Sequence, residues 1–112
     1  MLDNIGAGVE QYMNLLSTRQ KLVASNIANA DTPGYQTKDI DFANELASQM
    51  AGTKPNVIEV AGLKNKHDGN NVDMDREARL LAENALRFSV ASNLAHSEIT
   101  TIRTAITEAG KV

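Results

Sequence analysis

The sequence predicts an all-α fold in which long N- and C-terminal helices pack as a coiled-coil-like hairpin, joined by an extended arm with a short helix and little or no strand. Two observations predict this fold. Apolar residues repeat at alternating spacings of four and three in both terminal thirds, and both prolines lie in the middle third. We expect one structural domain with three parts: an N-terminal core helix over 1–30, the arm over 31–71 and a C-terminal core helix over 72–112.

The first helix is predicted by a stripe of residues spaced four and three apart, which places them on one helical face. Gln20 is the polar member of this stripe, and such a residue either sets the register of a coiled coil or is simply tolerated at the surface. Pro33 restricts the residue before it, so the helix should end by Asp31. The stripe comprises Val9, Met13, Leu16, Gln20, Val23, Ile27 and Ala30.

The arm begins with turn-forming residues. In the segment 32–35, Pro33 suits the second position of a type II turn and Gly34 permits the positive φ of the third. A short helix is predicted near 39–51, starting from a cap at Asp39 or Asp41. The segment 57–60 is the only strand-like run in the sequence.

The last third predicts the longest helix, over about residues 74–109 and roughly 54 Å long at 1.5 Å per residue, which is too long for a compact globule. Asp73 and Asp75 suit its N-terminal cap and first turn, and Gly110 suits its end. Spacings of four and three continue without a break through Met74, Ala78, Leu81, Ala85, Phe88, Ser92, Ala95, Ile99, Ile102, Ile106 and Ala109.

Parts of both predicted helices carry few charges outside the stripes. From Ser89 to Ile102 only Glu98 is charged, and Arg19 and Lys21 are the only charges between Gln11 and Ala30. Helices of this kind suit burial on more than one side, as in subunits of a packed assembly. The alternative is an ordinary two-helix hairpin with a neutral surface. We expect the apolar stripes of the two helices to meet, within one subunit or between neighbours.

Composition argues against catalysis and nucleic-acid binding. The chain has 112 residues, 4% of them aromatic, no cysteine and a net charge of −3. It has no basic patch with interleaved aromatic residues, and no nucleotide-binding or nucleophile motif. His67 and His96 show no metal-binding spacing. We therefore expect no enzyme activity, no cofactor, no small-molecule substrate and no nucleic-acid partner.

The acidic segment 68–77 resembles a calcium loop only superficially. An EF-hand that starts at Asp68 requires glycine at its sixth position and glutamate at its twelfth, where this chain has Asp73 and Arg79. A turn followed by an acidic helix start explains the segment better. Residues 1–8 contain Asp3 and no basic residue before an apolar stretch, so we expect no cleaved secretory signal.

Two segments resemble sequences of bacterial flagellar axial proteins. Residues 26–35 are similar to the NIAN-x-x-TPGY signature of that superfamily, carried here by Asn26, Asn29, Thr32, Pro33, Gly34 and Tyr35. A second signature resembles the proximal-rod protein B family in particular, and its residues are Asp68, Gly69, Asn70, Asn71 and Asp73. The segments 75–77, 82–88 and 103–106 follow that family in the same order, so the resemblance covers nearly the whole chain.

The resemblance implies a structural subunit of the flagellar basal-body rod, which crosses the periplasm and transmits motor torque. It implies terminal helices that form the core of a helical assembly, and export by the flagellar type III apparatus without signal cleavage. The implied partners are further copies of the chain, rod proteins of the C and F types, the basal-body adaptor protein E, the membrane ring and the export gate. Alternatives are another axial subunit of the rod protein C type, or a soluble coiled-coil adaptor that forms a stable dimer.

Overall fold

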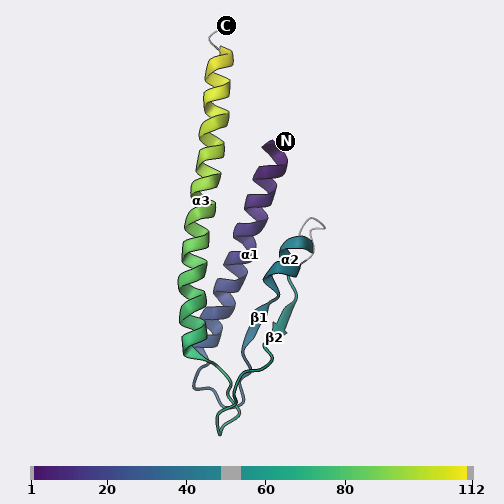
Figure 1. The fold of residues 1–112 in the computed structure, drawn as a ribbon, viewed down its shortest axis with the longest axis vertical. Coiled ribbons are helices and arrows are strands. Elements are labelled where there is room, and N and C mark those ends of the chain that lie inside the picture. Colours follow the sequence, from purple (N-terminus) through teal and green to yellow (C-terminus); the bar gives the residue numbers. More distant parts are fainter. Residues whose placement is uncertain (1, 49–53, 111–112) are drawn as a thin grey trace.

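The computed structural model describes residues 2–48 and 54–110 and has three helices and two short strands in those ranges. Helix α1 spans Leu2–Ala28, α2 spans Phe42–Ser48 and α3 spans Met74–Gly110. Helices α1 and α3 run antiparallel, side by side, with α2 and the strands on the far side of α1 (Figure 1). The molecule measures 72 × 26 × 17 Å. The all-α hairpin predicted from the sequence is confirmed.

The arm contains a minimal antiparallel sheet. Strand β1, Lys38–Ile40, pairs with β2, Val57–Glu59, with Asp39 opposite Ile58. The strand-like run was recognised in the sequence, whereas β1 was not. Helix α2 begins at Phe42, so of the two predicted caps Asp41 is the one that directly precedes the helix. Asp39 belongs to β1 instead. Residues 49–51 of the predicted helix lie outside the described residues.

The core lies along the contact of α1 with α3 and with the arm. It consists of Leu15, Leu16, Val23, Ile40, Val72, Leu80 and Ala91, each at most 6% exposed. Phe42 of α2 meets the ring of Tyr12 edge to face, with the centroids 5.7 Å apart. The guanidinium groups of Arg19 and Arg87 lie 5.6 and 5.7 Å from the centroid of the same ring. The arm therefore touches both long helices.

Helix α3 buries a different face from the one that its hydrophobic stripe predicts. Its buried residues are Glu77, Leu80, Asn84 and Ala91, whereas Leu81 and Phe88 of the stripe are 40% and 42% exposed. Because successive residues are about 100° apart on a helix, the buried face and the stripe are neighbouring faces. Polar residues occupy the buried face because they have partners there, as described below.

The stripes of α1 and α3 instead line one side of the hairpin. Two hollows lie between the helices. The first is lined by Leu16, Ala85 and Phe88 among others, and the second by Val9, Met13 and Ile99 among others. Arg87 points to the arm, and Phe88 is therefore turned about 100° away from it. We call this side of the hairpin the open face.

Candidate assembly site: a polar junction and an apolar face

The two predicted signature segments meet where the arm enters and leaves the hairpin. The chain segments 29–37 and 66–73 cross below the ends of α1 and α3 (Figure 1). Gly34 N–H donates to the Asp68 carbonyl at 2.8 Å, and Asn71 N–H donates to the Tyr35 carbonyl at 3.2 Å. Segments that lie far apart in the sequence are thus bonded by their main chains. We call residues 26–39 and 66–77 the junction.

The turn predicted over 32–35 is present. Tyr35 N–H donates to the Thr32 carbonyl at 3.2 Å, Pro33 occupies the second position, and Gly34 has a φ of 75°. Gly69 also has a positive φ, of 84°, and a β-carbon added there would lie 3.5 Å from the α-carbon of Gly34. Because 3.5 Å is an ordinary van der Waals distance, glycine is favoured at both positions by the positive φ rather than by lack of space.

Asn26 forms the centre of the junction and is fully buried. Its Nδ2 donates to the Lys38 carbonyl at 2.8 Å and to Glu77 Oε2 at 3.2 Å. Its Oδ1 accepts the Tyr35 hydroxyl at 2.9 Å and Lys38 N–H at 3.1 Å. All four hydrogen-bonding positions of the amide are therefore used. One side chain of α1 thus fixes the turn, the strand β1 and the start of α3 together.

Asn70 and Asn71 hold the second segment against the first. Asn70, fully buried, donates from Nδ2 to the carbonyls of Asn29 and Thr32, both at 2.8 Å. Asn71 Oδ1 accepts Thr37 N–H at 2.6 Å and the Thr37 hydroxyl at 2.8 Å. Asn29 itself bonds locally, donating to the Ser25 carbonyl and accepting the Thr32 hydroxyl. Short amides fit here because they satisfy main-chain groups that a crossing of loops leaves without sheet or helix partners.

The acidic residues of the second signature accept hydrogen bonds from main-chain N–H groups. Asp68 Oδ1 accepts Asn70 N–H at 3.0 Å, which closes an Asx turn. Asp73 Oδ1 accepts Asp75 N–H at 3.0 Å and Arg76 N–H at 3.3 Å, which caps α3. The prediction of a turn followed by an acidic helix start is confirmed.

Sequence reasoning missed a network of charges inside the junction. Asp39, 5% exposed, accepts Arg19 through both oxygens at 3.1 Å and Arg76 at 2.6 Å. Arg76 also pairs with the fully buried Glu77 at 2.7 Å. Two arginines and two carboxylates balance, so the burial of the charges is compensated. The charged residues of this network are visible in the sequence, at 75–77 and at Asp39. Their contact depends on the strand β1, which holds Asp39 in place and which the sequence did not reveal.

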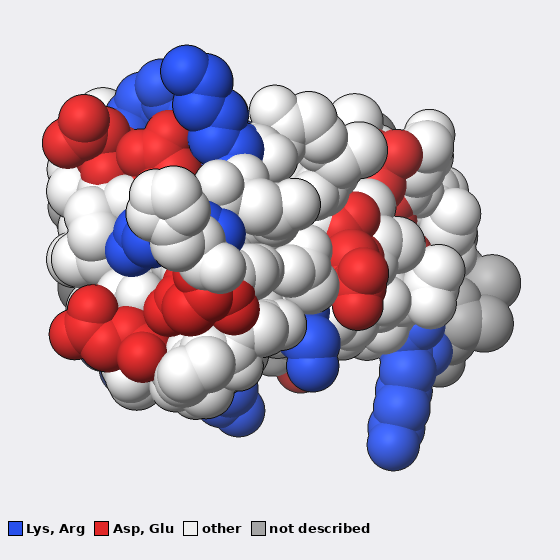
Figure 2. Space-filling model, turned by 90° about the horizontal axis from the view of Figure 1, so that it is seen from below, with Lys and Arg blue, Asp and Glu red and all other residues white. Residues whose placement is uncertain are grey.

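Seen from the junction end, the surface carries both signs of charge. Lysine and arginine side chains alternate with aspartate and glutamate, and large areas are uncharged (Figure 2). Among the described residues no group of three or more histidine, aspartate and glutamate side chains is placed to hold a metal ion, and no described helix is long and apolar enough to cross a membrane.

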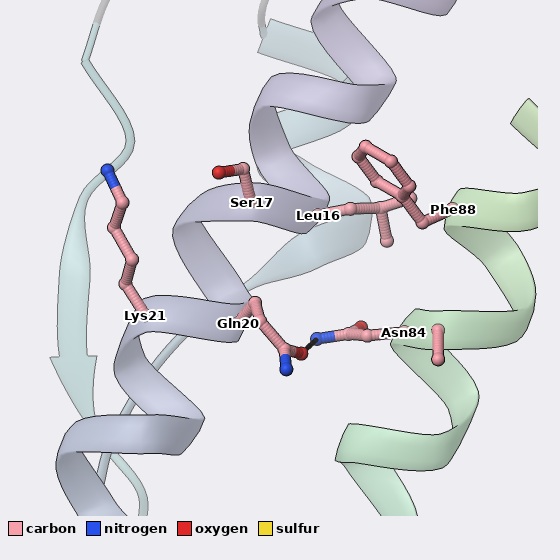
Figure 3. Close-up of a pocket in the computed structure, with 7 residues that line it drawn as sticks. Leu16, Ser17, Gln20, Lys21, Asn84 and Phe88 are labelled. Atoms are coloured by element: carbon pink, nitrogen blue, oxygen red, sulfur yellow. Dashed lines mark hydrogen bonds between the residues drawn. The ribbon is translucent and has the colours of Figure 1, made fainter. Parts of the chain in front are cut away.

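The remaining predicted site residues lie along the open face and beyond it. Leu16 and Val23 are buried, and Val9, Met13 and Ile27 are half-buried. Leu16 and Phe88 point toward one another across the first hollow (Figure 3). Ile99 is 52% exposed although it lines the second hollow beside α1, and Ile102 and Ile106, nearer the end of α3, are 38% and 67% exposed. Every residue from Ile99 to Gly110 is exposed.

Comparison with known proteins agrees with this geometry. Residues 13–36, which run from the open face into the junction, match the family model of the flagella basal body rod protein. The chain is 35% identical to the flagellar basal body rod protein FlgB of Salmonella typhimurium, over 88% of this chain and 92% of that protein. It is 34% identical to FlgB of Escherichia coli with the same coverage, and 31% identical to FlgB of Borrelia hermsii over 75% of this chain and 82% of that protein.

These relatives align over up to 127 residues, so they contain residues that this chain of 112 lacks. The similarity nevertheless covers most of this chain and most of each relative. The chain belongs to the FlgB family of flagellar basal body rod proteins, a family of structural subunits rather than enzymes.

Proposed function

We propose that the chain builds the proximal rod by helical assembly through the open face, and that the rod transmits motor torque to the outer flagellum. The observation that carries this proposal is the exposure of Leu81, Phe88 and Ile99 along one side of a hairpin whose other side the arm already touches. A rod that resists twist needs many close contacts over a long element, and α3 has 37 residues. The predicted stripe residues are then the contact residues between subunits.

The junction supports this function by fixing the direction in which the arm leaves the hairpin. Arg19, Asp39 and Arg76 connect α1, β1 and α3 through short ion pairs. A torque-bearing subunit requires such a connection, because an arm that turned freely about the end of α1 would not pass force to a neighbour.

The partners that we propose are further copies of the chain, rod subunits of the C and F types, the adaptor protein E, the membrane ring and the export gate. Family membership supports assembly with other basal-body components. We further propose export through the flagellar type III apparatus without signal cleavage. Mass spectrometry of the protein recovered from isolated basal bodies checks this last point: an intact N-terminus is expected, and loss of an N-terminal peptide would contradict it.

The test of the assembly proposal is a charge placed on the open face in cells. Phe88→Glu should abolish motility and rods in isolated basal bodies, because it buries a carboxylate in an apolar contact. The matched control is Asn93→Glu, which adds the same charge about 140° around the same exposed helix and should leave rods intact. Normal rods with Phe88→Glu would remove the open face from the contact.

A soluble coiled-coil adaptor, the alternative that the sequence left open, is not supported by membership of a rod-protein family. It predicts a discrete and highly helical dimer of the purified chain. A stable dimer that persists on dilution and never forms rods would favour it.

A further inference from the structure

The two edges of the small sheet in the arm differ in how their main-chain groups are used. Strand β1 lies on the side of α1 and β2 on the far side (Figure 1). On the edge that faces α1, Asn26 Oδ1 accepts Lys38 N–H at 3.1 Å and Asn26 Nδ2 donates to the Lys38 carbonyl at 2.8 Å. Asp39 Oδ1 accepts Ile40 N–H at 2.7 Å. Side chains therefore take the place of a further strand on this edge.

The pairing register shows which groups of β2 face away from β1. Val60 N–H donates to the Thr37 carbonyl at 2.9 Å, whereas Lys38 bonds to α1. In an antiparallel pair, alternate residues direct both main-chain groups to the partner strand, and the residues between them direct both groups away. Asp39 therefore faces β2 and forms a hydrogen-bonded pair with Ile58, which stands opposite it. The first and last residues of β2 must then point away from β1.

These outward residues, Val57 and Glu59, leave a free edge on β2. Within the described ranges 2–48 and 54–110, their outward N–H and C=O groups form no hydrogen bond. All three residues of β2 are exposed, Val57 by 47% and Ile58 by 41%. The β-branched side chains of these two residues lie on opposite faces of the strand and favour strand structure. An unpaired edge of this kind is a template for a further strand.

A second copy of this chain does not suit the free edge of β2 within a rod. Among the strands that the structure describes, β2 alone offers a free edge, so two copies pair only β2 to β2, about a two-fold axis. A two-fold pair closes on itself and does not repeat along a helical assembly. The strand that completes the sheet in a rod must therefore come from a different polypeptide.

We infer that β2 receives an extended segment of another basal-body protein as the third strand of the sheet. Main-chain hydrogen bonds to Val57 and Glu59 supply the affinity, and side chains of alternate residues supply the specificity. The segment should carry apolar residues against Val57 and Ile58, and a basic residue beside the Glu59 carboxylate. The inference rests on the proposed function, because it assigns a contact within the basal body, but it concerns a surface separate from the open face.

Amide hydrogen exchange at single-residue resolution tests the added strand in the assembly itself. In the free chain, the outward N–H groups of Val57 and Glu59 should exchange faster than the N–H of Ile58, which bonds to Asp39. In isolated basal bodies, exchange at Val57 and Glu59 should slow by about tenfold or more, because a strand then bonds to them. Exchange at these two residues that is as fast in basal bodies as in the free chain would overturn the inference.

The partner is identified by crosslinking, which the absence of cysteine from the chain makes specific to one site. Ile58→Cys, labelled with a benzophenone maleimide in isolated basal bodies, should give on irradiation an adduct with a different protein. Adducts only with further copies of this chain would overturn the assignment of the partner. Rods are present in these samples whatever the exchange and the adducts show, so either failure leaves the proposed function standing. The open-face variant Phe88→Glu tests that function separately.

Substitutions at Val57 separate the main-chain edge from the side chain. Val57→Pro removes an N–H group that β1 does not use, at the first residue of the strand, so the melting temperature of the free chain should fall by less than about 4 °C. Val57→Ala is the matched control, because it shortens the side chain and keeps the N–H group. In basal bodies, slow exchange at Glu59 should be lost with Val57→Pro and kept with Val57→Ala. Slow exchange that persists with Val57→Pro would show that the edge of β2 is not the contact.

Discussion

At the scale of single residues, the junction depends on side chains chosen for hydrogen-bonding capacity and backbone freedom. Asn26 uses all four positions of its amide, and Gly34 adopts a φ that L-residues rarely adopt. Neither property appears in hydrophobic periodicity. Gly34 was predicted from the residues that turns favour, whereas Asn26 was identified only through its resemblance to a family signature. The contacts of the computed structure supply the physical reason for that signature.

Replacement of Asn26 by alanine should destabilise the isolated chain by about 3 kcal/mol, because the Lys38 main-chain groups, the Tyr35 hydroxyl and Glu77 lose their partner together. Urea denaturation measures the change. The control is Asn93→Ala, on the exposed part of α3, which should change stability by less than about 0.5 kcal/mol. Equal effects of the two variants would show that Asn26 does not hold the junction.

Gly34→Val should destabilise the turn by more than about 1 kcal/mol, since a β-branched residue disfavours the positive φ of this position. The cost is conformational rather than steric, because a β-carbon at Gly34 meets nothing within 4 Å. Gly8→Ala, also in open space but within α1, should instead stabilise the chain by about 0.5–1 kcal/mol. Thermal melts of both variants give the comparison, and a stable Gly34→Val variant with normal rods would refute the role of the turn.

At the scale of the elements, the sequence predicted the long helices well because each carries a repeat over many turns. Helix α3 was placed at about 74–109 and is observed at Met74–Gly110. The strand β1 has three residues and depends on a distant partner, Val57–Glu59, so no local pattern reveals it. The charges at Arg19, Asp39, Arg76 and Glu77 escaped prediction for the same reason.

The face that α3 buries within the chain lies beside the face that carries its apolar stripe. Periodicity shows which residues share a face, but it does not distinguish a face buried within the chain from one that is exposed. Glu77 and Asn84 stand on the buried face because Asn26 and Gln20 bond them. Leu81 and Phe88 lie on the open face and are exposed. Large apolar side chains gathered on an exposed face indicate that another surface covers that face.

The difference between the buried face and the open face predicts opposite outcomes for two substitutions in α3 that each replace a large apolar side chain by alanine. Leu80→Ala, at a site 6% exposed, should lower the stability of the isolated chain by about 2–4 kcal/mol. Phe88→Ala, at a site 42% exposed, should cost the isolated chain far less, and about 3–5 kcal/mol only in assembled material. Chemical denaturation of the free chain and the yield of rods in cells measure the two quantities. A large loss of stability of the free Phe88→Ala chain would show that the stripe belongs to the monomer core.

At the scale of the whole molecule, we expect the junction end of the free chain to be better ordered than the opposite end. The junction end has buried polar networks and two crossing loops, whereas every residue from Ile99 to Gly110 is exposed at the other end. A chain of 112 residues with principal extents of 72 × 26 × 17 Å buries little apolar area for its length. We therefore expect folding of the free end to be coupled to assembly.

Hydrogen exchange of the free and the assembled chain tests this expectation. In the free chain, amides of residues 100–110 should exchange within the dead time of the measurement, while those around Asn26 and Asn71 stay protected because their hydrogen bonds are buried. In isolated rods both regions should be protected, since a neighbouring subunit then covers residues 100–110. Sedimentation and circular dichroism of the same free sample report its association state and helicity. A free chain that sediments as a dimer and already protects residues 100–110 would contradict this expectation, because the end of α3 would then be covered without a rod, as in a coiled-coil adaptor.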